Sequence, residues 1–397
     1  MRHSFLFLFI FSLFFVSCNH EETDKPYAFH NDVLLKTTPV KDQGQSQQCW
    51  VYAMLATIET ERLQLGDSVN LSPDWLARLW LQEQARTYYL TRGRTKVSLR
   101  GMMPMTLHLM DRYGIEPFDS YHPFGALSYN ALTKATMQVA RASTSLRMLD
   151  NRLGDVLDKQ IGYLPPTLFM LGMGYTPRQF AQSVYLPGDY VALTSFTHHP
   201  FGKPFVLESP DNRMLDRFYN IPIDKLMRTI IGALRHGHPV CWEGDISEPG
   251  FNFSKGIATL SDEAHTPTQQ ERQLAFEQFR TTDDHCMELC GLAHDNQHRL
   301  FFIAKNSWGT RNPYAGFMYL SYNYVRMKTI GVIVKSEKGG VKNSTARHFL
   351  QWPPPMAATT RKGNQPVFSH PAVGGRHWRR PLQIPYQLSK YLLRNPR

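Results

Sequence analysis

The chain has 397 residues, of which 42% are hydrophobic and 12% aromatic, and this composition excludes a fibrous or wholly disordered protein. Its formal net charge of +11 would suit a nucleic-acid partner, but residues 338–397 contain eleven Lys or Arg and no Asp or Glu. The rest of the chain is formally neutral, so we expect no binding of nucleic acid.

The first 17 residues have a short basic start and an apolar run from Phe5 to Val16. The run is too short to span a membrane comfortably but has the length expected in a signal peptide. The tetrapeptide Phe-Val-Ser-Cys that ends at Cys18 resembles the lipobox of bacterial lipoproteins, with Cys18 as the acylated residue. We expect an exported lipoprotein, anchored in the membrane and facing the periplasm or the cell surface; ordinary signal cleavage or an uncleaved anchor is the alternative.

The segment 43–46 is polar and favours a loop, whereas residues 49–63 contain no Gly or Pro and carry apolar side chains at helical spacing. Cys49 is therefore predicted at the N-terminus of a helix, where the helix dipole favours a thiolate, the nucleophilic form of cysteine. A lone Cys before such a helix is more often a buried apolar residue. A catalytic role for Cys49 needs a base and an orienting group elsewhere in the chain.

The middle of the chain changes from helical to strand-like patterns. Ser72 as N-cap and Pro73 as first helical residue predict a helix that runs to Leu90. Helical patterns also cover residues 102–113 and 129–160, and strand-like runs cover residues 189–195 and 239–244. A helix-rich first half followed by a strand-rich second half predicts an α+β protein with two lobes.

Two pairs of histidines could be taken for metal ligands. His198 and His199 precede a proline and have no Cys or carboxylate nearby at a ligand spacing. His236 and His238, which flank a glycine, are interpreted in the same way. The sequence has no HExxH, CxxC, P-loop or dinucleotide fingerprint. We therefore expect neither a metal ion nor a cofactor.

A predicted hairpin supplies the groups that Cys49 lacks. Its strands cover 284–292 and 299–309, joined by a polar turn, so His285 and Asn306 should lie at the same edge of the sheet. An amide can hold an imidazole by one hydrogen bond, and the imidazole can then take the proton of Cys49. Two further histidines and two further cysteines of the hairpin are interpreted as turn and core residues: His294, His298, Cys286 and Cys290.

These motifs resemble those of the papain-like cysteine peptidases. Gln43 and Cys49-Trp50 match the first motif of the family, and Asn306-Ser307-Trp308-Gly309 matches the last, with His285 on the catalytic histidine. The resemblance implies a two-lobed fold with a helical left lobe, an antiparallel β-sheet or barrel as right lobe, and helical insertions. It also implies a thiol peptidase acting on peptide substrates through Cys49, His285 and Asn306, with Gln43 in the oxyanion hole.

The spacing points to one branch of that family. His285 follows Cys49 by 236 residues, and the segment 237–245 resembles a strand of the bleomycin hydrolase and aminopeptidase C branch. That branch implies aminopeptidase action and a homo-oligomer, a hexamer in its known members. The long basic tail departs from the branch, so an endopeptidase, or a catalytically inactive binding lipoprotein of the same fold, stays open as an alternative.

The predicted organisation is a signal peptide at 1–17, a lipidated tether at 18–36, a peptidase domain at 37–336 and a disordered basic tail at 337–397. Within the peptidase domain, the helical lobe is expected at about 45–188 and the β-rich lobe at about 189–336.

Overall fold

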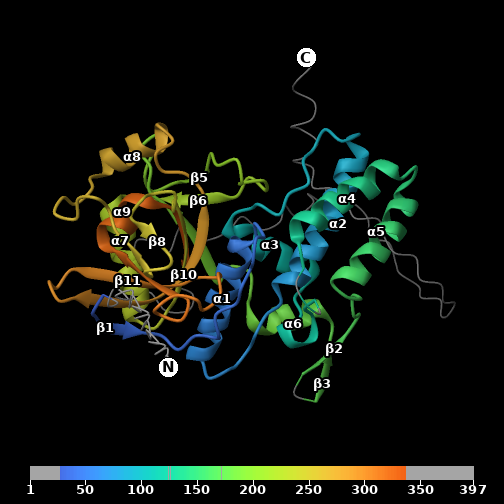
Figure 1. Ribbon diagram of the computed structural model, residues 1–397, viewed down its shortest axis with the longest axis horizontal. Helices are drawn as coiled ribbons and strands as arrows, with labels where there is room; N and C mark the ends of the chain where they lie inside the picture. The colour runs from blue at the N-terminus through green and yellow to red at the C-terminus, as the bar shows by residue number, and fades with distance from the viewer. Residues whose placement is uncertain (1–26, 124, 126, 171, 337–397) are drawn as a thin grey trace, which may run out of the picture. The chain divides into compact units, whose positions relative to one another are not determined.

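The computed structural model describes residues 27–123, 125, 127–170 and 172–336 (Figure 1). The predicted signal peptide, Cys18 and the basic tail lie outside these residues. Among the helices that the structure describes, none combines the length and the apolar character needed to cross a membrane.

The first half of the described chain is mainly helical. Its elements are β1 (Phe29–Leu34), α1 (Cys49–Gln64), α2 (Pro73–Leu90), α3 (Met103–Tyr113), η1 (Phe118–Ser120), α4 (Tyr129–Ala142), α5 (Leu146–Gln160), β2 (Leu168–Met170), β3 (Met173–Tyr175) and α6 (Pro177–Val184). The prediction that Cys49 begins a helix is confirmed. The predicted start of α2 is also confirmed, because the Ser72 hydroxyl accepts a hydrogen bond from the N–H of Trp75 at 3.1 Å.

The predicted helical stretch 129–160 is divided into α4 and α5. Ser145 causes the division, because its side chain accepts a hydrogen bond from the N–H of Met148 at 3.1 Å and so caps a new helix. The break changes the direction of the chain and lets both helices pack against α2.

The second half forms a mixed sheet with three helices. Its elements are β4 (Tyr190–Thr194), β5 (Pro204–Val206), β6 (Arg217–Asn220), α7 (Ile223–Arg235), β7 (Val240–Gly244), β8 (Phe251–Asn252), β9 (Ile257–Ala258), α8 (Gln269–Glu277), β10 (His285–Asp295), β11 (Leu300–Lys305), β12 (Phe317–Ser321), α9 (Tyr322–Lys328) and β13 (Thr329–Lys335). The strand order is β5-β6-β4-β13-β7-β10-β11-β12-β9-β8, with β1 paired to β10. Most neighbours are antiparallel; β4–β6 and β9–β12 are parallel. The α+β class is confirmed.

The predicted hairpin is present as β10 and β11. Glu288 pairs with Lys305 in the antiparallel register, so His285 and Asn306 both lie at the edge where β10 begins and β11 ends. The other side of β10 pairs with β7, where Cys286 is opposite Glu243. The start of β10 is therefore held by β7, and β11 pairs with β10 from Glu288 onward.

The tether predicted at 18–36 is too long at its C-terminal end. Residues 29–34 form β1, which pairs antiparallel with β10, with Phe29 opposite Asp295 and Leu34 opposite Gly291. The ring of Phe29 stacks on that of Tyr319 with centroids 3.9 Å apart. The polar residues between the apolar ones hid this strand, because it exposes one face to solvent.

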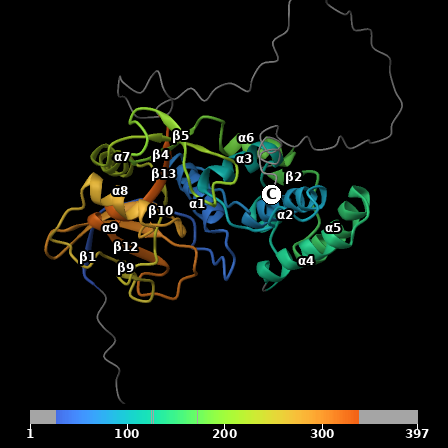
Figure 2. The same ribbon diagram turned by 90° about the horizontal axis from the view of Figure 1, so that it is seen from above.

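Helix α1 lies between the sheet and the other helices of the first half, as Figures 1 and 2 both show. It contacts β7 and β10 on one side and α2 and α3 on the other. Large apolar side chains of α1 are buried in these contacts: Trp50, Met54 and Ile58 are each at most 1% exposed. Because α1 is buried on both sides, its charged residue Glu59 must find its partners inside the protein.

Glu59 is the central polar residue of α1. Its fully buried carboxylate accepts hydrogen bonds from the Thr38 hydroxyl at 2.5 Å, the Lys41 ammonium at 2.6 Å and the N–H of Leu71 at 2.6 Å. The Lys305 ammonium donates to the Thr38 hydroxyl at 2.8 Å. The network joins the segment before Gln43, helix α1 and the end of β11.

We expect Glu59→Gln to lower the free energy of unfolding by about 3 kcal/mol, because it leaves buried donors without their charged acceptor. Urea denaturation measures the effect. Asp67→Asn is the control, since it removes a carboxylate from an exposed ion pair with Arg62 and should cost less than about 1 kcal/mol. Equal losses of unfolding free energy in the two variants would show that the buried network contributes no more to stability than an exposed ion pair.

Candidate active site

Cys49 is the first residue of α1 and is partly exposed. The first N–H groups of a helix have no partner within the helix, and the positive end of its dipole favours an anion. Cys49 lines a cavity of about 300 Å³ together with Gln43, His285 and Trp308. The structure therefore brings three distant parts of the sequence to one cavity.

His285 and Asn306 are hydrogen-bonded to each other. The distance from His285 Nε2 to Asn306 Oδ1 is 2.8 Å, and both residues are at most 3% exposed. Asn306 Oδ1 also accepts the N–H of Ser307 at 2.7 Å, which fixes it as the acceptor. In a neutral ring the proton is then on Nε2, and Nδ1 is the acceptor.

Trp308 packs against this pair. Its ring centroid lies 4.6 Å from that of His285, and the ring of Phe253 packs against Trp308 at 5.3 Å. The indole is partly exposed and lines the cavity, so it separates the buried hydrogen bond from solvent. A hydrogen bond in such surroundings is electrostatically stronger than in water.

The pKa of the Cys49 thiol lies well below its usual value. The largest cause is a hydrogen bond from the Cys286 thiol, followed by the hydrogen bond and the charge of His285, and together they outweigh burial, which raises the pKa. Cys286 was predicted as a core residue, and it is 1% exposed. Its contact with Cys49 is a tertiary one that no local pattern signals.

Gln43 is held by the loop that follows β11. Its backbone N–H donates to the Ser307 carbonyl at 2.8 Å, and its side-chain oxygen accepts from the Ser307 hydroxyl at 2.6 Å. The side-chain nitrogen donates to the Ser46 carbonyl at 2.7 Å. An amide nitrogen carries two hydrogens, so one stays available on the side chain that lines the cavity with Cys49.

Known proteins resemble this chain in sequence and in fold, although no family model matches it. It is 22% identical over 362 residues to aminopeptidase G of Lactobacillus delbrueckii subsp. lactis, covering 76% of this chain and 81% of that protein. It is 21% identical over 385 residues to aminopeptidase C of Streptococcus thermophilus, covering 81% and 85%. The solved structure of PepW from Lactobacillus rhamnosis matches with a TM-score of 0.60 and 18% identity, covering 77% and 82%.

The chain is similar to the papain-like cysteine peptidases of the aminopeptidase C branch. The resemblance inferred from the sequence motifs is thereby confirmed, and so is the papain-like fold. The large share of both chains that is covered shows that the likeness extends over most of the described residues and is not limited to the motifs.

The other residues of the hairpin lie away from the cavity of this papain-like chain. The prediction of His294 as a turn residue is wrong, because it lies in β10 opposite His30 and Leu300, with its Nδ1 2.8 Å from the Asp32 carboxylate. His298 is in the turn, exposed and with a positive φ of 59°. Cys290 is fully buried and donates to the Ile303 carbonyl at 3.5 Å. None of these three described residues lines the cavity with Cys49.

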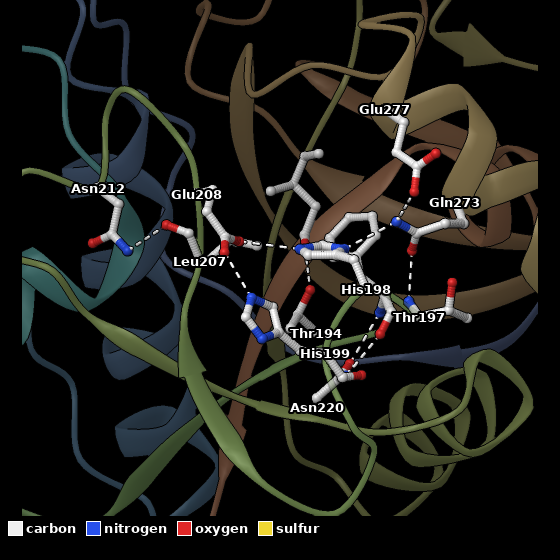
Figure 3. A network of polar contacts seen from close by, with 12 residues as sticks. Thr194, Thr197, His198, His199, Leu207, Glu208, Asn212, Asn220, Gln273 and Glu277 are labelled. Carbon is white, nitrogen blue, oxygen red and sulfur yellow. Dashed lines mark hydrogen bonds and ion pairs between the residues drawn. The ribbon is translucent and has the colours of Figure 1, made fainter.

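His198 and His199 do have a carboxylate beside them, which their spacing in the sequence does not reveal. Glu208 lies 3.1 Å from Nε2 of His198 and 2.6 Å from Nε2 of His199 (Figure 3). These three groups are close enough together to hold a metal ion. The chain brings them together because Glu208 follows β5, which is next to the turn that carries both histidines.

The surroundings of His198 oppose metal binding at its Nε2. The Gln273 carbonyl accepts the N–H of Thr197 at 2.5 Å, so its amide nitrogen is turned to Nδ1 of His198 and to Glu277 (Figure 3). An amide nitrogen that donates to Nδ1 leaves the ring proton on Nε2, whereas a ligating nitrogen must be free of its proton. This tautomer favours a hydrogen bond from His198 to Glu208 over coordination of a metal ion by the same nitrogen.

We expect Cys286→Ala to raise the pH at which Cys49 becomes reactive, because it removes the donor that stabilises the thiolate. In the wild type, alkylation of Cys49 by iodoacetamide should persist well below pH 8, and its midpoint should move upward in the variant. Mass spectrometry of the Cys49 peptide measures the rate at each pH. Cys290→Ala, on the same strand, is the control and should keep the wild-type midpoint; equal midpoints in all three proteins would refute the role of Cys286.

Proposed function

We propose that this protein is a cysteine peptidase in which Cys49 attacks the carbonyl carbon of a peptide bond. The observation that carries the proposal is the meeting of Cys49 and His285 at one cavity, with His285 held by Asn306 at 2.8 Å. The lowered pKa of Cys49 supports it, because the thiolate is the attacking form. The similarity to peptidases of the same fold is consistent with this chemistry.

The reaction follows from the positions of the protons. His285 takes the thiol proton of Cys49 on Nδ1, the sulfur bonds to the substrate carbon, and the same proton is then given to the leaving amine. Water, deprotonated by His285, hydrolyses the resulting thioester and restores the thiol. The N–H of Cys49 and the free hydrogen of the Gln43 amide would stabilise the oxyanion, and one such donor contributes about 3 to 4 kcal/mol.

We further infer that the enzyme removes residues from the N-terminus of peptides. Two relatives that match most of the chain are named aminopeptidases. The basic tail, where the sequence departs from this branch, lies outside the described residues, so an endopeptidase is the competing activity.

We also propose that the protein is exported and anchored by a lipid on Cys18. The support is the apolar run and lipobox-like tetrapeptide of the N-terminus. The expected result is incorporation of an alkyne fatty acid in a bacterial host, lost in Cys18→Ser and kept in the control Cys290→Ser. Absence of label in the wild type would leave ordinary signal cleavage or an uncleaved anchor.

A thiol-directed epoxide should label the wild-type protein on Cys49 and stop its hydrolysis of peptide amides. Cys49→Ala should show neither labelling nor hydrolysis, because it lacks the sulfur, whereas Cys290→Ala should keep both. Intact-mass spectrometry and a fluorogenic peptide assay measure the two properties. A folded wild type that neither reacts nor hydrolyses any peptide would favour the inactive binding protein.

For the choice between aminopeptidase and endopeptidase, we expect cleavage after the first residue of peptides with a free α-amino group. Acetylation of that group should lower kcat/KM by tenfold or more, since an exopeptidase must recognise the chain end. Product analysis by mass spectrometry identifies the cleaved bonds. Internal cleavage of acetylated peptides at an equal rate would establish an endopeptidase instead.

A further inference from the structure

The cavity that holds Cys49 has an acidic wall. Asp211, Glu243, Asp283 and Asp284 line it together with a single described cation, Arg100. Arg100 Nε donates to the Asp211 carboxylate at 2.7 Å, and its terminal nitrogen donates to the backbone carbonyl of Asp283 at 3.3 Å. The charge of Arg100 is thus paired with Asp211, and the rest of the wall keeps its acidic character.

Glu243 is the least expected residue of this wall. It lies on β7 opposite Cys286, which places its side chain on the sheet face that meets α1 and Cys49. It is 0% exposed, and neither of its carboxylate oxygens has a partner of normal hydrogen-bond geometry among the described residues, although the Asp283 carboxyl and the Cys286 thiol lie beside it. A buried carboxyl group with no donor costs stability, so its presence beside the nucleophile calls for a functional explanation.

Asp283 adjoins Glu243 and has one donor. The Ser209 hydroxyl bonds its Oδ2 at 2.7 Å. Burial raises the pKa of Asp283 to about 6, and burial followed by the charge of Asp283 raises the pKa of Glu243 well above its usual range. Two adjacent buried carboxyl groups hold a proton more readily than separate ones do, and the side-chain ion pair of Arg100 is made with Asp211 and not with either of them.

We propose that the carboxyl pair of Glu243 and Asp283 binds a cationic nitrogen of the peptide substrate next to the cleaved bond. This proposal rests on the peptidase function proposed for Cys49. The cation would be the free α-ammonium group of the substrate or the side chain of a Lys or Arg residue. Both offer several N–H donors, which is what two buried carboxyl groups lack, and charge-assisted hydrogen bonds of this kind are strong.

The location favours a role in substrate selection over a role in bond cleavage. Glu243 and Asp283 line the same cavity as Cys49 and His285, so a cation bound by the pair would be held in the cavity where the carbonyl is attacked. The ring of His285 is held by Asn306 and not by either carboxyl group. Loss of the pair should therefore weaken binding and positioning of cationic substrates and leave thiol chemistry intact.

Four fluorogenic amides separate the two sources of the cation: lysine and norleucine amides, each with a free and with an acetylated α-amino group. If the pair binds the α-ammonium, the wild type prefers both free amides to both acetylated ones. If it binds a side chain, the wild type prefers lysine to norleucine even when acetylated. In either case Glu243→Gln and Asp283→Asn should reduce that preference at least about tenfold, mainly through KM.

Glu116→Gln is the matched control. Glu116 is also 0% exposed with both oxygens unpaired among the described residues, but it does not line the cavity. Its variant should keep the wild-type preference. Epoxide labelling of Cys49 in each protein shows that the site is folded and reactive.

The outcomes distinguish the two proposals. A wild type that is neither labelled nor active overturns the peptidase function itself. Labelled and active variants of Glu243 and Asp283 that keep wild-type preferences for all four amides overturn only the role of the carboxyl pair. A loss of activity that is equal for cationic and neutral substrates, with labelling retained, overturns it as well.

Discussion

The site depends on the buried carboxylate of Glu59, ten residues along α1 from Cys49. Its two oxygens accept from the Thr38 hydroxyl, the Lys41 ammonium and the N–H of Leu71. Thr38 in turn accepts from Lys305, the residue that precedes Asn306. A buried charge is tolerated only when its partners are all in place, so the carboxylate requires these segments to assemble together. The same assembly brings Gln43 and Cys49 to one cavity and places Asn306 against His285.

The interface between the helical half and the β-rich half contains both apolar and polar side chains. Cys241 and Cys286 lie on strands of the sheet, yet both belong to the apolar core of the helical half, because α1 packs over them. A second core within the β-rich half includes Trp242 of β7, Phe302 of β11 and Tyr324 of α9. Cys49 lies where these cores meet, so its environment combines a helix terminus with groups carried by β7 and β10.

Local signals predicted the parts of the site that are local. The start of α1, the N-cap Ser72 and the hairpin of β10 and β11 follow from residues that are neighbours in the sequence. Strand β1 was missed because its polar face hides the alternation, and Glu208 was missed because its meeting with His198 depends on the path of a loop. The carboxyl pair of Glu243 and Asp283 was missed for a similar reason, because β7 and the segment before β10 become neighbours only in the folded sheet.

The cavity places a thiol with a lowered pKa beside carboxyl groups whose pKa values are raised, first by burial and further by the charge of Cys49. A negative charge on Cys49 raises the pKa of Glu243 and of Asp283, so the proton is kept by the carboxyl pair while the thiolate is kept by its donors, Cys286 and His285. Each anion makes the other less favourable in a buried site. A cation bound between them would relieve both, so a positively charged substrate would stabilise the arrangement that attacks it.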